Sequence, residues 1–236
     1  MRRIFFAVIL VVACATIASA GPAEDALSAY QREDYALAVR LFRPLAEQGD
    51  AQTQFNLGWM YSNGKGVPQD AQEASKWYRK AAEQGYVQAQ FNLGSMYRDG
   101  VGVIQNDQEA LKWYRLAAEQ RNAKAQYMLG WFYGNGQGVA QNAHEALKWY
   151  RLAAKQGDVL AQVNLGAMYA DGEVVPKNII SALMWGILAS ASSNSDEVKT
   201  AIEFRKELES RMTAAQIERA QVLARRCRQS NFTECD

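Results

Sequence analysis

Hydrophobic and polar positions along this chain recur with a period of 36 residues. A leucine, a glycine and a tyrosine keep this spacing through four units, and a tryptophan–tyrosine pair keeps it through three. These positions are Leu57, Leu93, Leu129 and Leu165; Gly58, Gly94, Gly130 and Gly166; Tyr61, Tyr97, Tyr133 and Tyr169; and Trp77-Tyr78, Trp113-Tyr114 and Trp149-Tyr150. The spacing indicates an internal repeat, with units at about 34–69, 70–105, 106–141 and 142–177 and a partial last unit.

Each unit contains two segments in which residues of one kind recur three and four positions apart, the spacing of a helix face. The first two such segments predict helices over 50–62 and 69–84. Small residues such as Gly58 and Ala82 allow two helices to approach closely, and the aromatic residues fill the space beside them. The pattern therefore predicts an all-α fold of stacked helix pairs.

The two helices of a unit are joined by turns that contain two glycines in three of the units, at 64 and 66, 100 and 102, and 136 and 138. Glycines in such turns indicate positive φ angles. A phosphate-binding loop would require a preceding strand, whereas these turns follow helices. The fourth turn keeps only Gly172, so we expect it to differ.

Both ends of the chain depart from the repeat. We predict a leading helix over 22–31, a helix over 179–191 that carries Trp185-Gly186 instead of Trp-Tyr, and two further helices over 196–210 and 214–226. Thr213 is the expected N-cap of the last helix. Terminal units of a solenoid cover its exposed apolar ends. The prediction is thus a repeat region over 21–191, followed by capping helices and a cysteine-containing tail over 192–236.

The first twenty residues have the layout of a secretory signal peptide, with Arg2 and Arg3, an apolar run over 4–13 and a small-residue site at 18–20. We expect cleavage after Ala20. No second apolar run long enough to span a membrane follows in the sequence. The alternatives are an uncleaved anchor and a lipoprotein whose lipid is attached to Cys14. The protein is therefore predicted to be exported, to the periplasm first and secreted or lipid-anchored second.

The net charge bears on the kind of partner, and the cysteine count bears on a disulfide. After cleavage the chain has 24 Lys and Arg against 25 Asp and Glu, a net charge of −1, which favours neither nucleic acid nor an anionic membrane. Cleavage also removes Cys14 and leaves Cys227 and Cys235, eight residues apart in a polar tail. An even number of cysteines in an exported protein favours a disulfide between them, with two free thiols as the alternative.

The repeated pattern, including the segment EALKWYRLAA at 109–118 and again at 145–154, resembles the Sel-one-like repeat (SLR) family, which is related to tetratricopeptide repeats. The resemblance extends from about residue 34 to residue 190. It implies an α/α solenoid, a right-handed superhelix of helix-turn-helix repeats. It also implies protein–protein assembly, often in the bacterial periplasm, and no catalysis.

In the resembled family, the side of each first helix that faces away from its second helix lines the concave groove. Here that side carries aromatic residues and asparagines, which could bind a polypeptide segment. We therefore predict a partner-binding surface, with two alternatives: a core contact between units, or an oligomer contact. The candidate residues are Gln52, Phe55, Asn56, Trp59, Phe91, Asn92, Tyr127, Trp131 and Asn164.

Catalytic signals are weak. His144 stands at a repeat position that holds glutamine in the two preceding units, which predicts a surface side chain. Ser62 and Lys65 match the Ser-x-x-Lys spacing of penicillin-recognising enzymes, but Gly64 is expected to end the helix between them. No metal-ligand spacing or nucleophile elbow is found, so we predict no metal, no cofactor and no enzyme.

Three functions remain open from the sequence. The first is an envelope scaffold or adaptor that binds a partner protein on its concave face. The second is a secreted effector or adhesin that contacts host proteins, and the third is a hydrolase of cell-wall material or β-lactams. The partner's identity and the oligomeric state are left open.

Overall fold

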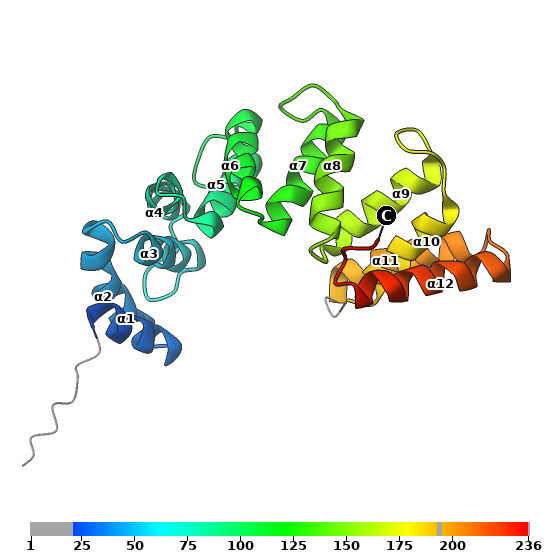
Figure 1. Cartoon of the computed structure of the whole chain (residues 1–236). Helices are drawn as coiled ribbons and strands as arrows, with labels where there is room; N and C mark the ends of the chain where they lie inside the picture. The colour runs from blue at the N-terminus through cyan, green and yellow to red at the C-terminus, as the bar shows by residue number, and fades with distance from the viewer. Residues whose placement is uncertain (1–20, 193–194, 236) are drawn as a thin grey trace, which may run out of the picture.

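The computed structural model describes residues 21–192 and 195–235, in which every regular element is an α-helix. The helices follow one another along an arc, and α3 and α5 lie nearer its inner side than α4 and α6 (Figure 1). The predicted signal peptide, with Cys14, lies outside the described residues. The helices are α1 (Pro22–Gln31), α2 (Tyr35–Glu47), α3 (Ala51–Asn63), α4 (Ala71–Glu83), α5 (Val87–Asp99), α6 (Asp107–Glu119), α7 (Ala123–Asn135), α8 (Ala143–Ala154), α9 (Val159–Asp171), α10 (Ile179–Ser190), α11 (Ser195–Glu209) and α12 (Ala214–Gln229).

The predicted α/α solenoid is confirmed, and the helix limits differ from the predicted ones by only a few residues. Predicted starts at 50 and 69 become 51 and 71 because Asp50 and Asp70 are N-caps, whose carboxylates accept hydrogen bonds from backbone N–H groups of the first turn. Thr213 is the N-cap of α12, in a capping box with Gln216.

A glycine on α3, α5 and α7 forms a notch that receives a tyrosine ring from the second helix of the same pair. A Cβ atom added to Gly94 would lie 2.9 Å from the Tyr114 ring, and one added to Gly130 would lie 2.5 Å from the Tyr150 ring. Such distances are too short for a Cβ atom, so glycine is required here because the ring leaves no space for a side chain. The recurrence of Gly and Tyr at 36 residues therefore reflects a contact made inside three helix pairs, α3–α4, α5–α6 and α7–α8.

The turns also bind consecutive units together. Gly102, in the turn after α5, has φ +70°, and a Cβ there would lie 2.1 Å from the backbone oxygen of Ala71 at the start of α4. The second glycine of the turn thus permits close approach to the preceding unit. In the fourth turn Val174 takes this position and packs, half-buried, against the adjacent core, so this turn differs as expected.

Buried glutamines form a further ladder along the solenoid. The side-chain amide of Gln90 donates to the backbone oxygen of Ala82 at 3.1 Å and accepts from Gln120 at 2.8 Å. Gln54 and Gln126 make the equivalent pairs of contacts. In this ladder the buried amide groups of the glutamines find hydrogen-bond partners, which buried polar groups need.

The C-terminal end fills its last notch differently. Gly186 stands on α10 at the position that holds tyrosine in the three preceding second helices. Phe204 from α11 enters instead, and a Cβ on Gly166 would lie 2.8 Å from its ring. Helices α11 and α12 both pack on α10 (Figure 1). After α12, the favoured disulfide is present: it joins Cys227 to Cys235, both buried.

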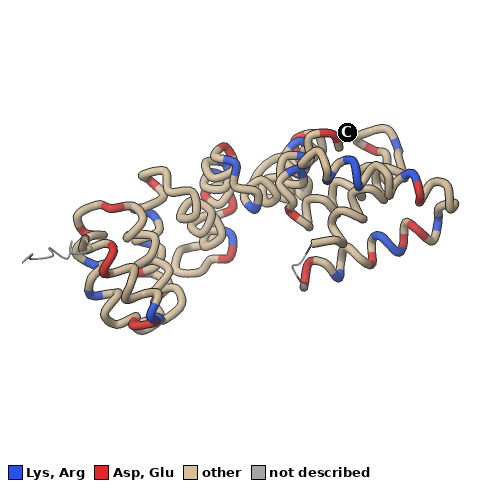
Figure 2. Tube along the Cα trace, turned by 60° about the horizontal axis from the view of Figure 1, so that its bottom comes forward, with Lys and Arg blue, Asp and Glu red and all other residues tan. Residues whose placement is uncertain are grey.

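Acidic and basic side chains alternate along the chain, without a long stretch of one sign (Figure 2). Among the described helices, none is long and apolar enough to cross a membrane.

Candidate partner-binding surface

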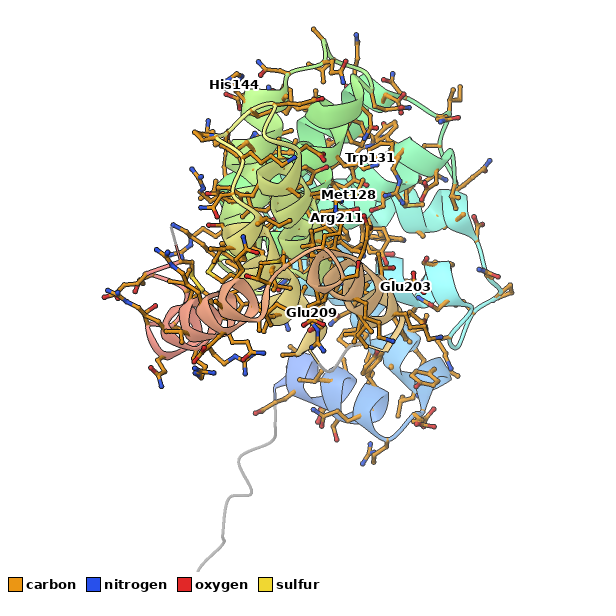
Figure 3. All side chains as sticks on the ribbon, turned by 90° about the vertical axis from the view of Figure 1, so that its right-hand side faces the viewer. Met128, Trp131, His144, Glu203, Glu209 and Arg211 are labelled. Atoms are coloured by element: carbon orange, nitrogen blue, oxygen red, sulfur yellow. A yellow bond between two sulfur atoms is a disulfide. The ribbon has the colours of Figure 1, made fainter. Side chains whose placement is uncertain are left out.

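We call the concave face the surface of α3, α5, α7 and α9 that is turned away from their second helices. Met128 and Trp131 of α7 lie toward the middle of the molecule when it is viewed along the arc, whereas His144 lies at its outer edge (Figure 3). The concave face has three regions, which differ in what already covers the aromatic side chains.

The first region is a row of rings in contact with the notch tyrosines. Phe55, Phe91 and Tyr127 are half-buried, and their ring centroids lie 5.7, 5.7 and 6.0 Å from those of Tyr78, Tyr114 and Tyr150. These contacts are made within one unit each, and they leave little of each ring to a partner. We therefore assign this row to the wall of the solenoid.

Asparagines of the concave face hydrogen-bond one of the notch tyrosines and the tyrosine of the ring row. Asn92 hydrogen-bonds the hydroxyl of Tyr78, and Asn164 hydrogen-bonds that of Tyr127. Burial raises the pKa of Tyr78 to about 12, so its hydroxyl stays protonated at physiological pH. These two asparagines, both half-buried, are thus tied to the wall and expose only part of their amides.

The second region is the N-terminal end, where Tyr30 of α1 contacts Trp59 of α3. The Trp59 ring contacts the Tyr30 ring of α1 at a centroid distance of 5.6 Å, with the planes at 72°. Gln52, which is exposed, and Asn56, half-buried, line a hollow of about 210 Å³ against α1. Part of the predicted surface is therefore occupied by the chain's own leading helix.

The third region surrounds Trp131, which separates two hollows. The α5–α7 hollow, of about 260 Å³, is lined by Arg98, Tyr127, Met128 and Trp131. The α7–α9 hollow, of about 410 Å³, is lined by Trp131, Gly134, Asn135, Gln141, Ala143, Ala146, Tyr150, Asn164, Ala167, Met168, Asp171, Glu173 and Val174. Of the nine predicted residues, the structure brings Tyr127, Trp131 and Asn164 together here.

The residues that line these hollows but are absent from the predicted set include Arg98, Met128, Asp171 and Glu173. The repeat contains a signal for them. At the position of Met128 the other three units have asparagine, and at the position of Arg98 they have serine, glycine and alanine. Arg98 thus departs from the repeat at a partly exposed position, whereas the departure at Met128 is buried in the core between α6 and α7.

A partly buried carboxylate lies beside this region. Asp158 is the N-cap of α9 and accepts a hydrogen bond from the backbone N–H of Ala161 at 2.9 Å. Burial raises its pKa to about 6, and the nearby carboxylate of Glu197 on α11 adds to this shift, while Lys124 opposes it.

Residues considered for chemistry are not assembled into a site. Ser62 lies in the last turn of α3, whereas Lys65 follows Gly64, which ends that helix in the left-handed conformation. His144 is exposed in the first turn of α8. Within residues 21–192 and 195–235, no group of three His, Cys, Asp or Glu side chains is placed to hold a metal ion.

Comparison with known proteins agrees with this architecture. The Sel1 repeat family model matches five segments, four of them 36 residues long, at 28–50, 51–86, 87–122, 123–158 and 159–194. The chain belongs to the Sel1 repeat family. Proteins of this family are generally protein–protein interaction scaffolds and are typically non-catalytic.

Solved structures that are similar to the chain include the following two. A Sel1 repeat protein from Oxalobacter formigenes is 33% identical with a TM-score of 0.69, and the match covers 82% of this chain and 86% of that one. A protective antigen of uropathogenic Escherichia coli with an SLR fold is 30% identical with a TM-score of 0.71, over 89% of this chain and 53% of that one. No curated protein matches the chain.

Proposed function

We propose that this protein is a non-catalytic scaffold of the bacterial envelope that holds a partner polypeptide on its concave face. The observation that carries the proposal is the setting of Trp131, a half-buried aromatic side chain with an open hollow on each side. Aromatic side chains between pockets supply a large share of the energy in protein interfaces. Trp59, at the same repeat position, is covered by α1, so the partner would bind toward α7 and α9.

Two observations support an exported location. The first twenty residues have the pattern of a signal peptide. The paired Cys227 and Cys235 are compatible with an oxidising compartment, where disulfides persist. The periplasm is the compartment we propose, with attachment through a lipid on Cys14 as the variation.

Site-specific photocrosslinking in intact cells tests the surface. A photoreactive amino acid would replace Asn135 or Asn92 on the concave face, which leaves Trp131 in place, and Ile104 or Leu116 elsewhere as exposed controls. We expect a discrete crosslinked product from the concave positions only. Equal products from both sets, or products from the control positions alone, would contradict the proposal.

A second candidate is a secreted protein that contacts host proteins through the same face. It is supported by the similarity to a structure described as a protective antigen of uropathogenic Escherichia coli. Cell fractionation separates the two candidates: a periplasmic pool favours the scaffold, and accumulation in the culture medium favours the secreted protein.

A further inference from the structure

The repeat provides an internal comparison for the two hollows beside Trp131. Both lie between consecutive first helices, and both contain the C-terminal turn of a first helix. The last residue of that helix is Asp99 in α5 and Asp171 in α9. The residue just before it is Arg98 in α5 and Ala170 in α9, so only the first aspartate has a cationic neighbour.

In the α5–α7 hollow the charges are already satisfied. The guanidinium of Arg98 donates to both carboxylate oxygens of Asp99, at 2.7 and 2.9 Å, and lowers the pKa of that carboxyl. Another nitrogen of the same guanidinium lies 3.4 Å from the sulfur of Met128. The remaining lining consists of Tyr127, Met128 and Trp131, so this hollow suits an aliphatic side chain.

In the α7–α9 hollow the negative charge has no counter-charge. Among the described residues, no cation pairs with Asp171 or Glu173, and no Lys, Arg or His lines the hollow. The C-terminal ends of α7 and α9 both border it, and a helix C-terminus carries partial negative charge. Asp171 and Glu173 are both exposed, and a cation bound beside them is favoured by their charge and by that of the helix ends.

The uncharged polar groups of this hollow present acceptors as well. The Asn135 amide nitrogen donates to the backbone oxygen of Trp131 at 2.8 Å, and that of Gln141 donates to the backbone oxygen of Gly134 at 2.8 Å. Their side-chain oxygens remain as acceptors. The apolar part of the lining comes from alanines and Met168, which suit the methylene stem of a long side chain.

Gly134 makes room for such a side chain. It occupies the repeat position of Arg98, and a Cβ added there would meet only Ala146 and Tyr150, both at 3.7 Å. This glycine has no positive φ and forms no close helix contact, so neither backbone nor packing requires it. Its effect is to leave the hollow open beside the indole of Trp131, where a cation could also contact the ring.

We infer that the concave face selects a polypeptide segment that presents one basic and one aliphatic side chain on the same side. The Lys or Arg side chain enters the α7–α9 hollow toward Asp171 and Glu173, and the aliphatic side chain enters the α5–α7 hollow beside Met128. Trp131 lies between them. This inference rests on the proposed function, since it names the chemistry of the partner for the same surface.

Selection from a phage-displayed library of random short peptides on the purified chain, expressed from its full sequence, tests the inference. We expect enriched peptides to share a basic and an aliphatic residue and to lose binding to the Trp131→Ala variant. Affinity for the double variant Asp171→Asn, Glu173→Gln should fall by about tenfold, the usual effect of losing a charged hydrogen-bond partner. Replacing the basic residue of the peptide by methionine should cost the wild-type chain a similar factor.

Two further variants make the test specific. Gly134→Arg places a guanidinium in the hollow, as Arg98 does in its own unit, and should abolish the preference for basic peptides. Ile104→Gln changes a side chain that is 91% exposed and lines neither hollow, so it should leave binding unchanged. Circular dichroism of each variant verifies that the helices are retained.

The outcomes separate the inference from the proposed function. Peptides that need Trp131 but bind equally well without the two carboxylates, or that contain no basic residue, would overturn the inference and leave the concave surface standing. Peptides that bind the Trp131→Ala variant as tightly as the wild type, or the enrichment of no peptide, would overturn both.

Discussion

The interior of the solenoid and its C-terminal end solve the same packing problem with different residues. In the interior, the notch at Gly94 receives Tyr114 from its own second helix. At the end, the second helix has Gly186 at the tyrosine position, and Phe204 from the following helix fills the notch at Gly166. One aromatic ring per notch is retained, but its source moves from inside the unit to the cap.

This difference shows how a repeat array can be ended. In an array each unit contacts its neighbours only, so an additional regular unit would leave a further apolar face to cover. Removing the tyrosine from α10 opens a place that only α11 can fill, which fixes the cap on the last unit. The predictions below test this comparison, in order of decreasing effect.

The largest effect is expected from Tyr114→Ala in the interior. The ring is fully buried, and loss of a buried aromatic side chain costs about 4 kcal/mol of unfolding free energy. Because the residue lies in the middle of the array, hydrogen exchange should rise on both sides of it. Tyr114→Phe is the control: it loses only the hydrogen bond to Ser95 and should cost about 1 kcal/mol. Similar losses for both variants in denaturant titrations would refute the notch contact.

Phe204→Ala should cost less, about 3 kcal/mol, because the ring is only half-buried. The increase in hydrogen exchange should be confined to α11, α12 and the adjoining part of α10. Adding Gly186→Tyr to this variant restores the interior arrangement and should recover at least half of the loss. In the wild-type background Gly186→Tyr should destabilise, because the new ring competes with Phe204. If the stability effects of Phe204→Ala and Gly186→Tyr simply add in the double variant, the two rings do not occupy the same notch, which would contradict this account.

Cys227→Ser combined with Cys235→Ser should cost about 2 kcal/mol, as expected for opening a short disulfide loop. The tail after α12 contributes Phe232 to a hollow that is also lined by Trp149 and Leu152, so its release would expose these side chains. Trypsin should then cleave after the arginines near residue 227 much faster than in the oxidised wild type. Equal cleavage rates would show that the disulfide does not hold the tail.

The smallest effect is a change in pH dependence on Asp158→Asn. Because the folded pKa of Asp158 is raised to about 6, its neutral form is favoured in the native state. Its contribution to stability is fully present below about pH 4 and is lost as the pH rises through about 6. The variant should therefore melt about 2 to 4 °C higher than the wild type at about pH 7, with the difference vanishing in acid.

Asparagine keeps the cap, as Asn122 does at the equivalent position of the preceding unit. Asp158→Ala provides the control, because it should lose about 1 kcal/mol of capping energy even in acid. A difference between Asp158→Asn and the wild type that does not change with pH would rule out the buried carboxylate as its cause.

Much of the fold could be predicted from the sequence, because each helix contact is repeated. The period predicted the helices to within a few residues. The N-cap at Asp50 explains why α3 starts one residue later than predicted, and the N-cap at Thr213 confirms the predicted start of α12. The role of Phe204 could not be predicted, since it depends on how the chain returns over α10 after the repeat has ended. The glutamine ladder had a signal at the same period, at Gln54, Gln90, Gln126 and Gln162.

The candidate surface was less accessible to prediction. Trp59 and Trp131 share a repeat position, but α1 covers the first and leaves the second between two hollows. Helical periodicity could not distinguish them, because the covering helix lies outside the repeat. Arg98 and Glu173 were missed because they face the hollows from the end of a helix and from a turn.

The most direct test of the central claim compares Trp131→Ala with Trp59→Ala in both stability and partner binding. Binding is measured in cells as the crosslinking yield from Asn92, and stability as the denaturant midpoint of the purified chains. Trp131→Ala should lower binding by about 30-fold, as for a hot-spot residue, with little loss of stability. Trp59→Ala should lower stability and largely preserve binding. A Trp131→Ala chain that is destabilised but binds its partner normally would contradict the assignment of the concave face.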